Sequence, residues 1–296
     1  MGKQKVVCFG EVLWDLFPEG KKLGGAPFNV ASSLSSLGAE VCFISRIGED
    51  DLGISLLQEV DNQGVAIDFI QRDSNHKTGE VIISLNAAGN ASYEIVGDAA
   101  WDFIEIDEKV IEVISQSRAF IFGSLIARGS SYATLTSFLS LAKFRVFDLN
   151  LRPPHYDYKL LKNLMRQAEM LKFNDEELYE VAIAMNSPYH SMDQHIKYIA
   201  EQTQTEIICV TKGRFGAVLY YKGKRYFNSG FKVKVEDTVG AGDSFLATLI
   251  YSLLEGDSPQ LALNRACAMG ALVAGSLGAN PDISVKDLKQ FMGKGV

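Results

Sequence analysis

The segment Val-Glu-Asp-Thr-Val-Gly-Ala-Gly-Asp-Ser-Phe at residues 235–245 carries the strongest structural signal in the sequence. Small residues fill positions 240–242, and an apolar pattern with helical spacing follows them at Phe245, Leu246, Leu249, Ile250 and Leu253. Free backbone N–H groups at a helix N-terminus bind anions, and glycine lets an anion approach the backbone closely. The segment therefore predicts a phosphate site at the start of a helix. From spacing alone, Asp243 could equally be an aspartate that only complements the helix dipole.

Two common nucleotide motifs do not fit the sequence. No G-x-x-x-x-G-K-[ST] segment occurs, which argues against a P-loop. Phe245 stands where a dinucleotide fingerprint starting at Gly240 would need its third small residue. The sequence thus disfavours an NAD-dependent oxidoreductase.

The chain around this segment alternates short apolar runs with amphipathic stretches. Continuous apolar runs, typical of parallel strands covered on both faces, occur at 6–9, 41–44, 119–122 and 207–210, and the segment 145–149 is a further candidate buried strand. Helical spacing occurs at 28–37, 52–63, 132–143, 158–168, 242–254, 259–277 and 285–291. This alternation predicts an α/β fold with a mainly parallel sheet and helices on both faces.

Residues 67–104 break the alternation. Two strand-like runs, 78–85 and 92–96, flank the turn-like residues 86–90. We expect this stretch to form a small β appendage, with a contribution from residues 11–24.

Composition limits the functional classes. The 296 residues are 47% hydrophobic and carry a net charge of −7, which argues against a nucleic-acid or membrane-surface partner. No apolar run reaches the ~18 residues of a membrane span, and the N-terminus lacks a signal-peptide pattern. The four cysteines form no C-x-x-C pair, so we expect buried thiols in a reducing cytoplasm.

The segment at 237–245 resembles the C-terminal signature of the ribokinase/PfkB carbohydrate kinases, D-T-x-G-A-G-D-x-F. Four more family elements follow the family order: GGAPFNVA at 24–31, DLNLRP at 148–153, NDEE at 174–177 and TKGRFG at 211–216. The resemblance implies a single ribokinase-like domain over residues 1–296. That fold has three α/β/α layers and a small β-sheet lid, here formed by about 11–24 and 67–104.

The resemblance also implies the roles of the residues in the quoted segment. Asp243 would be the general base that takes the proton of a sugar hydroxyl as it attacks the γ-phosphorus of ATP. The backbone N–H groups of Gly240, Ala241, Gly242 and Asp243 would form an anion hole for the transferring phosphoryl group.

The other family elements supply the remaining site residues. The acceptor sugar would contact Asp15, Gly24, Gly25, Asn29, Tyr93 and Arg152. The nucleotide would lie against Asn174, Thr211, Gly213, Gly216 and Asn264. Magnesium would be ordered through water by Glu177, and potassium would bind at Asp237 and Val239.

Two features bear on the choice of sugar. The segment EVLWDLFP at 11–18, followed by GGAPFNVA, is most similar to bacterial fructokinases. No arginine lies between Arg72 and Arg118, although an acidic or phosphorylated acceptor would call for one in the lid. Fructose is therefore the first expectation, although Lys21 and Lys22 could lie near the acceptor.

Other readings stay open. 2-Keto-3-deoxygluconate, ribose and nucleosides are alternative acceptors, and a non-catalytic sugar or nucleotide sensor is the alternative from another class. A homodimer through the exposed face of the lid is a further expectation from the resemblance.

Overall fold

A computed structural model describes residues 4–18, 20–85 and 91–293, with only the backbone described at 83–85 and 91–93. Within these ranges, nine strands form the central sheet in the order β13-β12-β11-β10-β9-β8-β1-β4-β5. Neighbouring strands from β11 to β5 are parallel, whereas β11–β12 and β12–β13 are antiparallel. The strands are β1 (Lys5–Phe9), β4 (Glu40–Gly48), β5 (Ile70–Asp73), β8 (Ala119–Gly123), β9 (Arg145–Asp148), β10 (Met170–Asn174), β11 (Ile207–Thr211), β12 (Ala217–Tyr221) and β13 (Lys224–Asn228).

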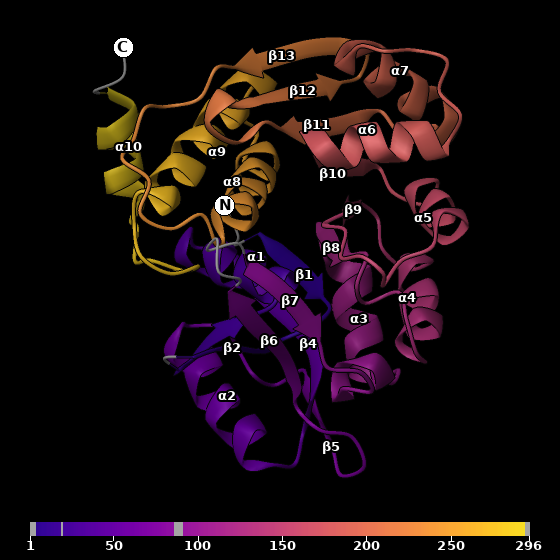
Figure 1. Ribbon diagram of the computed structural model, residues 1–296, viewed down its shortest axis with the longest axis vertical. Helices are drawn as coiled ribbons and strands as arrows, with labels where there is room; N and C mark the ends of the chain where they lie inside the picture. Colours follow the sequence, from indigo (N-terminus) through magenta and orange to yellow (C-terminus); the bar gives the residue numbers. More distant parts are fainter. Residues whose placement is uncertain (1–3, 19, 86–90, 294–296) are drawn as a thin grey trace.

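Each face of this sheet is covered by helices, as the continuous apolar runs predicted (Figure 1). In β1, Val7 and Phe9 join one core, and Val6 and Cys8 join the core on the other face. The first core takes its helices from α3 (Glu108–Gln116), α4 (Ser131–Leu139), α5 (Tyr158–Met165), α6 (Asp175–Ala184) and α7 (Met192–Thr203). The second takes α1 (Ala26–Ser36), α2 (Asp51–Asn62), α8 (Ala241–Leu254) and α9 (Pro259–Ala274). This arrangement confirms the three-layer α/β/α fold.

A separate small sheet has the order β3-β2-β6-β7. Its strands are β2 (Leu13–Phe17), β3 (Gly20–Gly24), β6 (Gly79–Leu85) and β7 (Ala91–Ile95). The turn expected at 86–90 lies outside the described residues. The β6–β7 pairing is antiparallel, as the two strand-like runs suggested.

The small sheet is narrower than the segment expected for it. β5 pairs with β4 in the central sheet, and the 3-10 helix η1 (Ala100–Phe103) packs into the main core through the fully buried Trp101. Both elements are only four residues long, which is too short for a periodic sequence pattern that would have distinguished them from the small sheet. The ends of the 67–104 segment thus belong to the main body.

The remaining elements are the 3-10 helix η2 (Gly213–Phe215) and α10 (Val285–Gly293). The cysteines at 8, 42, 209 and 267 are all buried free thiols, as expected. Among the described residues, no helix is both long and apolar enough to cross a membrane. The carboxyl ends of the parallel strands lie along one edge of the sheet, and the turns that follow them build the candidate site.

Candidate active site

The first turn of α8 forms the centre of the site. Gly240, at the N-cap, is in the left-handed region with φ 76°. The N–H of Ala241 donates to the carbonyl of Thr238 at 3.3 Å, and the N–H of Ser244 donates to that of Gly240 at 2.9 Å. In the part of the chain that the structure describes, the N–H groups of Gly242 and Asp243 meet no acceptor. This turn therefore offers two unpaired donors at the positive end of a helix, as an anion site requires.

The turn packs closely on the loop after α9. A Cβ atom at Gly240 would lie only 2.2 Å from the carbonyl oxygen of Ala279, so glycine is needed there for space as well as for φ. Asp237 ties the same two segments together, because its Oδ1 accepts from Val239 N at 3.0 Å and its Oδ2 from Gly278 N at 3.3 Å. The predicted potassium residues thus form a turn joined to the 275–280 loop.

Asp243 is joined to the N-terminal part of the chain. Nδ2 of Asn29, in α1, donates to Oδ2 of Asp243 at 2.8 Å. Nδ2 of Asn280 in turn donates to Oδ1 of Asn29 at 2.9 Å. Dense packing around the carboxyl raises the pKa of Asp243, although Lys172, Asn29 and Arg152 oppose this. The predicted base and a predicted acceptor residue therefore meet directly.

No sequence pattern assigns a role to Lys172, which the structure places beside this turn. Its Nζ lies 3.0 Å from Oδ1 of Asp148, and both residues are buried. A Cβ atom at Gly242 would lie 3.6 Å from the same nitrogen. Burial lowers the pKa of Lys172, but the charges of Asp148, Glu177 and Asp243 together raise it. The sequence pattern that could have indicated Lys172 is a charged residue within the otherwise apolar strand β10.

Glu177 and Asn174 form a capping box at the start of α6. One carboxylate oxygen of Glu177 accepts from Asn174 N at 2.8 Å, and the other from Leu151 N at 2.9 Å. Glu177 is only 6% exposed, and burial raises its pKa. Glu177 therefore fixes the turn that follows β9, the turn that carries Arg152.

Most of the residues predicted to bind the acceptor lie on β2, β3 and the start of α1. A Cβ atom at Gly24 would lie 2.2 Å from Oδ2 of Asp15, so glycine at 24 makes room for this carboxylate. A Cβ atom at Gly25 would lie 2.5 Å from the backbone oxygen of Glu11. Partial burial raises the pKa of Asp15 to about 6, against the charges of Arg152 and Lys22.

Glu11 is a second residue that the sequence did not single out. It is 4% exposed, and among the described residues its Oε2 has no hydrogen-bond partner. Burial raises its pKa to about 7, its own amide and Arg152 lower it, and Asp243 raises it. The sequence pattern that could have indicated it is a glutamate two residues after the apolar strand β1.

The predicted nucleotide residues gather at the ends of β11 and β13. A Cβ atom at Gly216 would lie 2.0 Å from the carbonyl oxygen of Asn228, whose Nδ2 donates to Oδ1 of Asn264 at 2.9 Å. Thr211 ends β11 and Gly213 begins η2. The side chain of Tyr93 lies outside the described residues.

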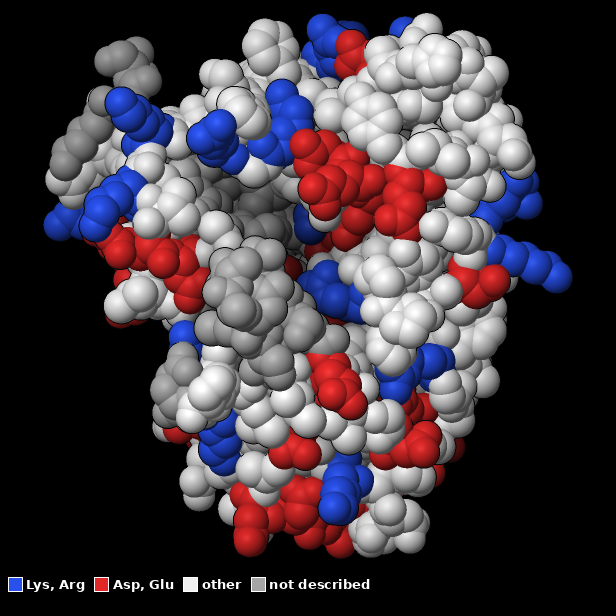
Figure 2. All heavy atoms as spheres, viewed as in Figure 1, with Lys and Arg blue, Asp and Glu red and all other residues white. Residues whose placement is uncertain are grey.

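The surface near these elements is hollowed and acidic. Figure 2 shows Asp and Glu side chains gathered over α6, beside a depression in this face of the molecule. Asp175, Glu176 and Glu177 all lie in the first turn of α6. Figure 2 also shows Lys and Arg side chains on other sides of the depression, so the acidic cluster covers one side of it, where it suits a ligand that brings its own cations.

Comparison with known proteins gives a family. The chain matches the model of the pfkB family carbohydrate kinases over residues 3–286. A fructokinase of Escherichia coli is 30% identical to it over 84% of each chain. Probable fructokinase-4 of Arabidopsis thaliana is 28% identical, over 99% of this chain and 98% of that protein.

Solved structures agree in fold. A fructokinase of Vibrio cholerae, in a form with fructose, ADP and calcium bound, is 24% identical with a TM-score of 0.83, over 98% of this chain and 99% of that one. A 2-dehydro-3-deoxygluconokinase of Thermotoga maritima is 21% identical with a TM-score of 0.87, over the same shares. Because the family model covers nearly the whole sequence, the chain belongs to the pfkB family of carbohydrate kinases and is a sugar kinase.

Proposed function

We propose that this protein transfers the γ-phosphoryl group of ATP to a neutral sugar, and that the sugar is fructose, giving fructose 6-phosphate. One observation carries the proposal: Asp243 and the unpaired N–H groups of residues 242 and 243 occupy a single turn of α8. A proton acceptor and an anion site are then within reach of one reacting phosphoryl group.

The residues of this turn and Asp15 would have different roles in the reaction. Asp243 would take the proton of the attacking hydroxyl, and its raised pKa makes the carboxylate a stronger base than a free aspartate. The N–H groups of Gly242 and Asp243 would stabilise the charge on the transferring phosphoryl group. Asp15 would hold hydroxyls of the acceptor, since a carboxylate accepts several hydrogen bonds from a polyol.

The charge balance favours a neutral acceptor. Glu11 and Asp148 are each 4% exposed, and Asp243 and Asp15 add two more carboxylates near the acceptor. The charge of Arg152 lowers the pKa of all four groups, so it acts on four carboxylates at once. An anionic sugar would add negative charge to a site where these four carboxylates outnumber Arg152 and the paired Lys172.

Two further cationic side chains near the small sheet already contact other protein groups. Arg128 forms an ion pair with Asp102 at 2.8 Å and stacks over Trp101. Nζ of Lys21 donates to Ser55 in α2 at 2.9 Å and lies over the Trp14 ring. Neither side chain would need to turn toward a neutral sugar.

The nucleotide and ions fit the residues present. The α8 turn offers backbone donors for phosphate oxygens, and the acidic surface over α6 suits a magnesium-bound nucleotide. Magnesium would neutralise phosphate charge during transfer. Both carboxylate oxygens of Glu177 accept backbone N–H groups, so Glu177 would act through water. Asp237 and Val239 would hold potassium beside the turn.

The test is ADP release with magnesium-ATP against fructose, ribose, 2-keto-3-deoxygluconate, fructose 6-phosphate and adenosine, with and without potassium. We expect fructose to give the highest kcat/KM. We expect Asp243→Asn to lower kcat by about 10²–10⁴-fold while retaining ATP binding, because a general base contributes that range. Asp68→Asn removes an exposed carboxylate in the turn before the edge strand β5 and should leave kcat unchanged.

Each contrary result has a distinct meaning. Preference for an acidic or phosphorylated sugar would overturn the fructose assignment and retain the kinase. Near-normal turnover in Asp243→Asn would overturn the role of Asp243. ATP binding without turnover on any acceptor would favour the sensor instead.

A further inference from the structure

Asn280 lies in the loop after α9 and reaches the base through a second asparagine. Its Nδ2 donates to Oδ1 of Asn29 at 2.9 Å, and Nδ2 of Asn29 donates to Oδ2 of Asp243 at 2.8 Å. Asn29 is 5% exposed, so little water can replace either bond. Three polar side chains from distant segments thus form one hydrogen-bonded chain that ends at the base.

The chemistry of these groups fixes the direction of the chain. An ionised carboxylate only accepts hydrogen bonds, so Asn29 must present its NH₂ group to Asp243. The carbonyl oxygen of Asn29 then faces Asn280, which must donate in turn. Asn280 therefore selects the one amide orientation of Asn29 that donates to the carboxylate.

The loop that carries Asn280 also contacts the anion-binding turn. Gly278 N donates to Asp237 at 3.3 Å, and Gly240 packs on the carbonyl of Ala279. Residues 278 and 279 therefore contact the segment at 237–240 directly. The next residue, Asn280, reaches the Asp243 carboxylate in the first turn of α8 through Asn29. This loop is placed to set the two parts of the site relative to each other.

We propose that Asn280 is a positioning residue of the phosphoryl-transfer reaction, which acts through Asn29 to hold the Asp243 carboxylate facing the acceptor hydroxyl. This inference rests on the proposed role of Asp243 as the base. Oδ1 of Asn280 is buried without a partner among the described residues, so its bond to Asn29 is the contact that orients its amide. No atom of Asn280 itself needs to meet a substrate.

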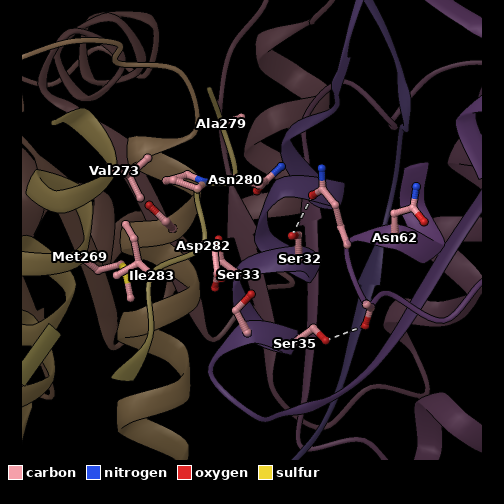
Figure 3. A pocket seen from close by; sticks show the side chains of 15 residues that line it. Ser32, Ser33, Ser35, Asn62, Met269, Val273, Ala279, Asn280, Asp282 and Ile283 are labelled. Carbon is pink, nitrogen blue, oxygen red and sulfur yellow. Dashed lines mark hydrogen bonds between the residues drawn. The ribbon is translucent and has the colours of Figure 1, made fainter. Parts of the chain in front are cut away.

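The cavity beside Asn280 supplies a matched control. It has a volume of about 500 Å³ and is lined by residues of α1, α2, α9 and the 279–283 loop, with Asn280 and Asn62 both among them (Figure 3). Asn62 ends α2 and is exposed. Asn62→Asp therefore adds the same charge to the same cavity without touching Asn29.

The experiment compares the pH dependence of kcat/KM for the sugar in Asn280→Leu, Asn280→Asp and Asn62→Asp. Leucine removes the donor, so Asn29 is free to turn away from Asp243. Aspartate can only accept, so it should draw the NH₂ group of Asn29 toward residue 280 and turn its carbonyl toward Asp243. The charges already around Asp243 are Lys172, Arg152, Glu11 and Asp148, and none of these is altered.

We expect the acid limb of the profile to move to higher pH by about one unit in Asn280→Leu, because a hydrogen bond to a charged group is lost. The shift should be larger in Asn280→Asp and absent in Asn62→Asp. On the acid limb itself, kcat/KM should fall about tenfold in Asn280→Leu and further in Asn280→Asp, with partial recovery at higher pH.

A second readout does not depend on activity. The ¹³C NMR titration of the Asp243 carboxyl, assigned by its loss in Asp243→Asn, should move in parallel with the acid limb. Unshifted titration in both Asn280 variants, or an equal shift in Asn62→Asp, would overturn the inference. If Asp243→Asn keeps normal turnover, the proposed function fails instead, so the two failures are distinguishable.

Discussion

Nζ of Lys172 lies 3.0 Å and 3.1 Å from the two carboxylate oxygens of Asp148, and both side chains are almost completely buried. The pair stands between the capping box of α6 and the first turn of α8, since Glu177 and Asp243 both act on the charge of Lys172. Lys172 therefore places a positive charge at the point where the carboxylates of Asp148 in β9, Glu177 in α6 and Asp243 in α8 converge.

Replacing Lys172 by methionine tests this pair. We expect Lys172→Met to lower the free energy of unfolding by about 3–5 kcal/mol, because Asp148 is left as a buried charge without its partner. Urea denaturation measures the change. The exposed pair of Lys5 and Glu40 is the control, and Lys5→Met should cost less than about 1 kcal/mol. A loss in Lys172→Met as small as that of the control would show that water already reaches the pair.

Glu11 should make stability depend on pH. Its pKa is raised by burial from 4.5 to about 7, so between these values the folded protein binds a proton that the unfolded chain releases. The contribution of Glu11 to stability is therefore fully present below pH 4.5 and is lost as pH rises through about 7, by about 3 kcal/mol in total. We expect Glu11→Gln to raise the free energy of unfolding at pH 8 and to change it little at pH 5. Equal effects at the two pH values in urea titrations would contradict this.

Asp15 should couple acceptor binding to pH. Its pKa is about 6, so its carboxylate becomes a neutral acid as pH falls through that value. We expect KM for the sugar to rise below pH 6 and Asp15→Asn to raise it about 10–100-fold at pH 8, as the loss of hydrogen bonds to a charged group would. KM for ATP should stay nearly unchanged in steady-state kinetics. Parallel increases in both KM values would mean that Asp15 lies outside the acceptor site.

Gly240 can be tested against another left-handed glycine. Gly256 has φ 88° and open space where a Cβ would lie, so Gly256→Ala should cost only the conformational penalty of about 1–2 kcal/mol. Gly240→Ala should cost more, because its Cβ would overlap the carbonyl of Ala279. It should also weaken ATP binding in calorimetry, whereas Gly256→Ala should not. Equal losses of stability and normal ATP binding in both variants would show that the turn tolerates a side chain.

Much of the fold was predictable because its signals are local. The runs at 6–9 and 119–122 became the buried strands β1 and β8, since strands covered on both faces must be continuously apolar. Predicted helix limits failed where tertiary contacts decide them: α9 ends at Ala274, and not at Leu277 as the apolar pattern suggested. Its end meets the segment before α8, where the carbonyl of Ala274 accepts from Glu236 N at 2.9 Å.

The sequence by itself determined the turn at the start of α8, which we propose binds a phosphoryl group, because glycine and alanine at 240–242 and the helix after them are contiguous, and backbone conformation depends mainly on neighbouring residues. Only the tertiary structure decided what surrounds Asp243. Asn29 is 214 residues away along the chain, and Lys172 reads in the sequence as one lysine among many. The orientation and pKa of a buried carboxylate depend on charges and donors from every segment packed against it, and folding alone brings those segments together.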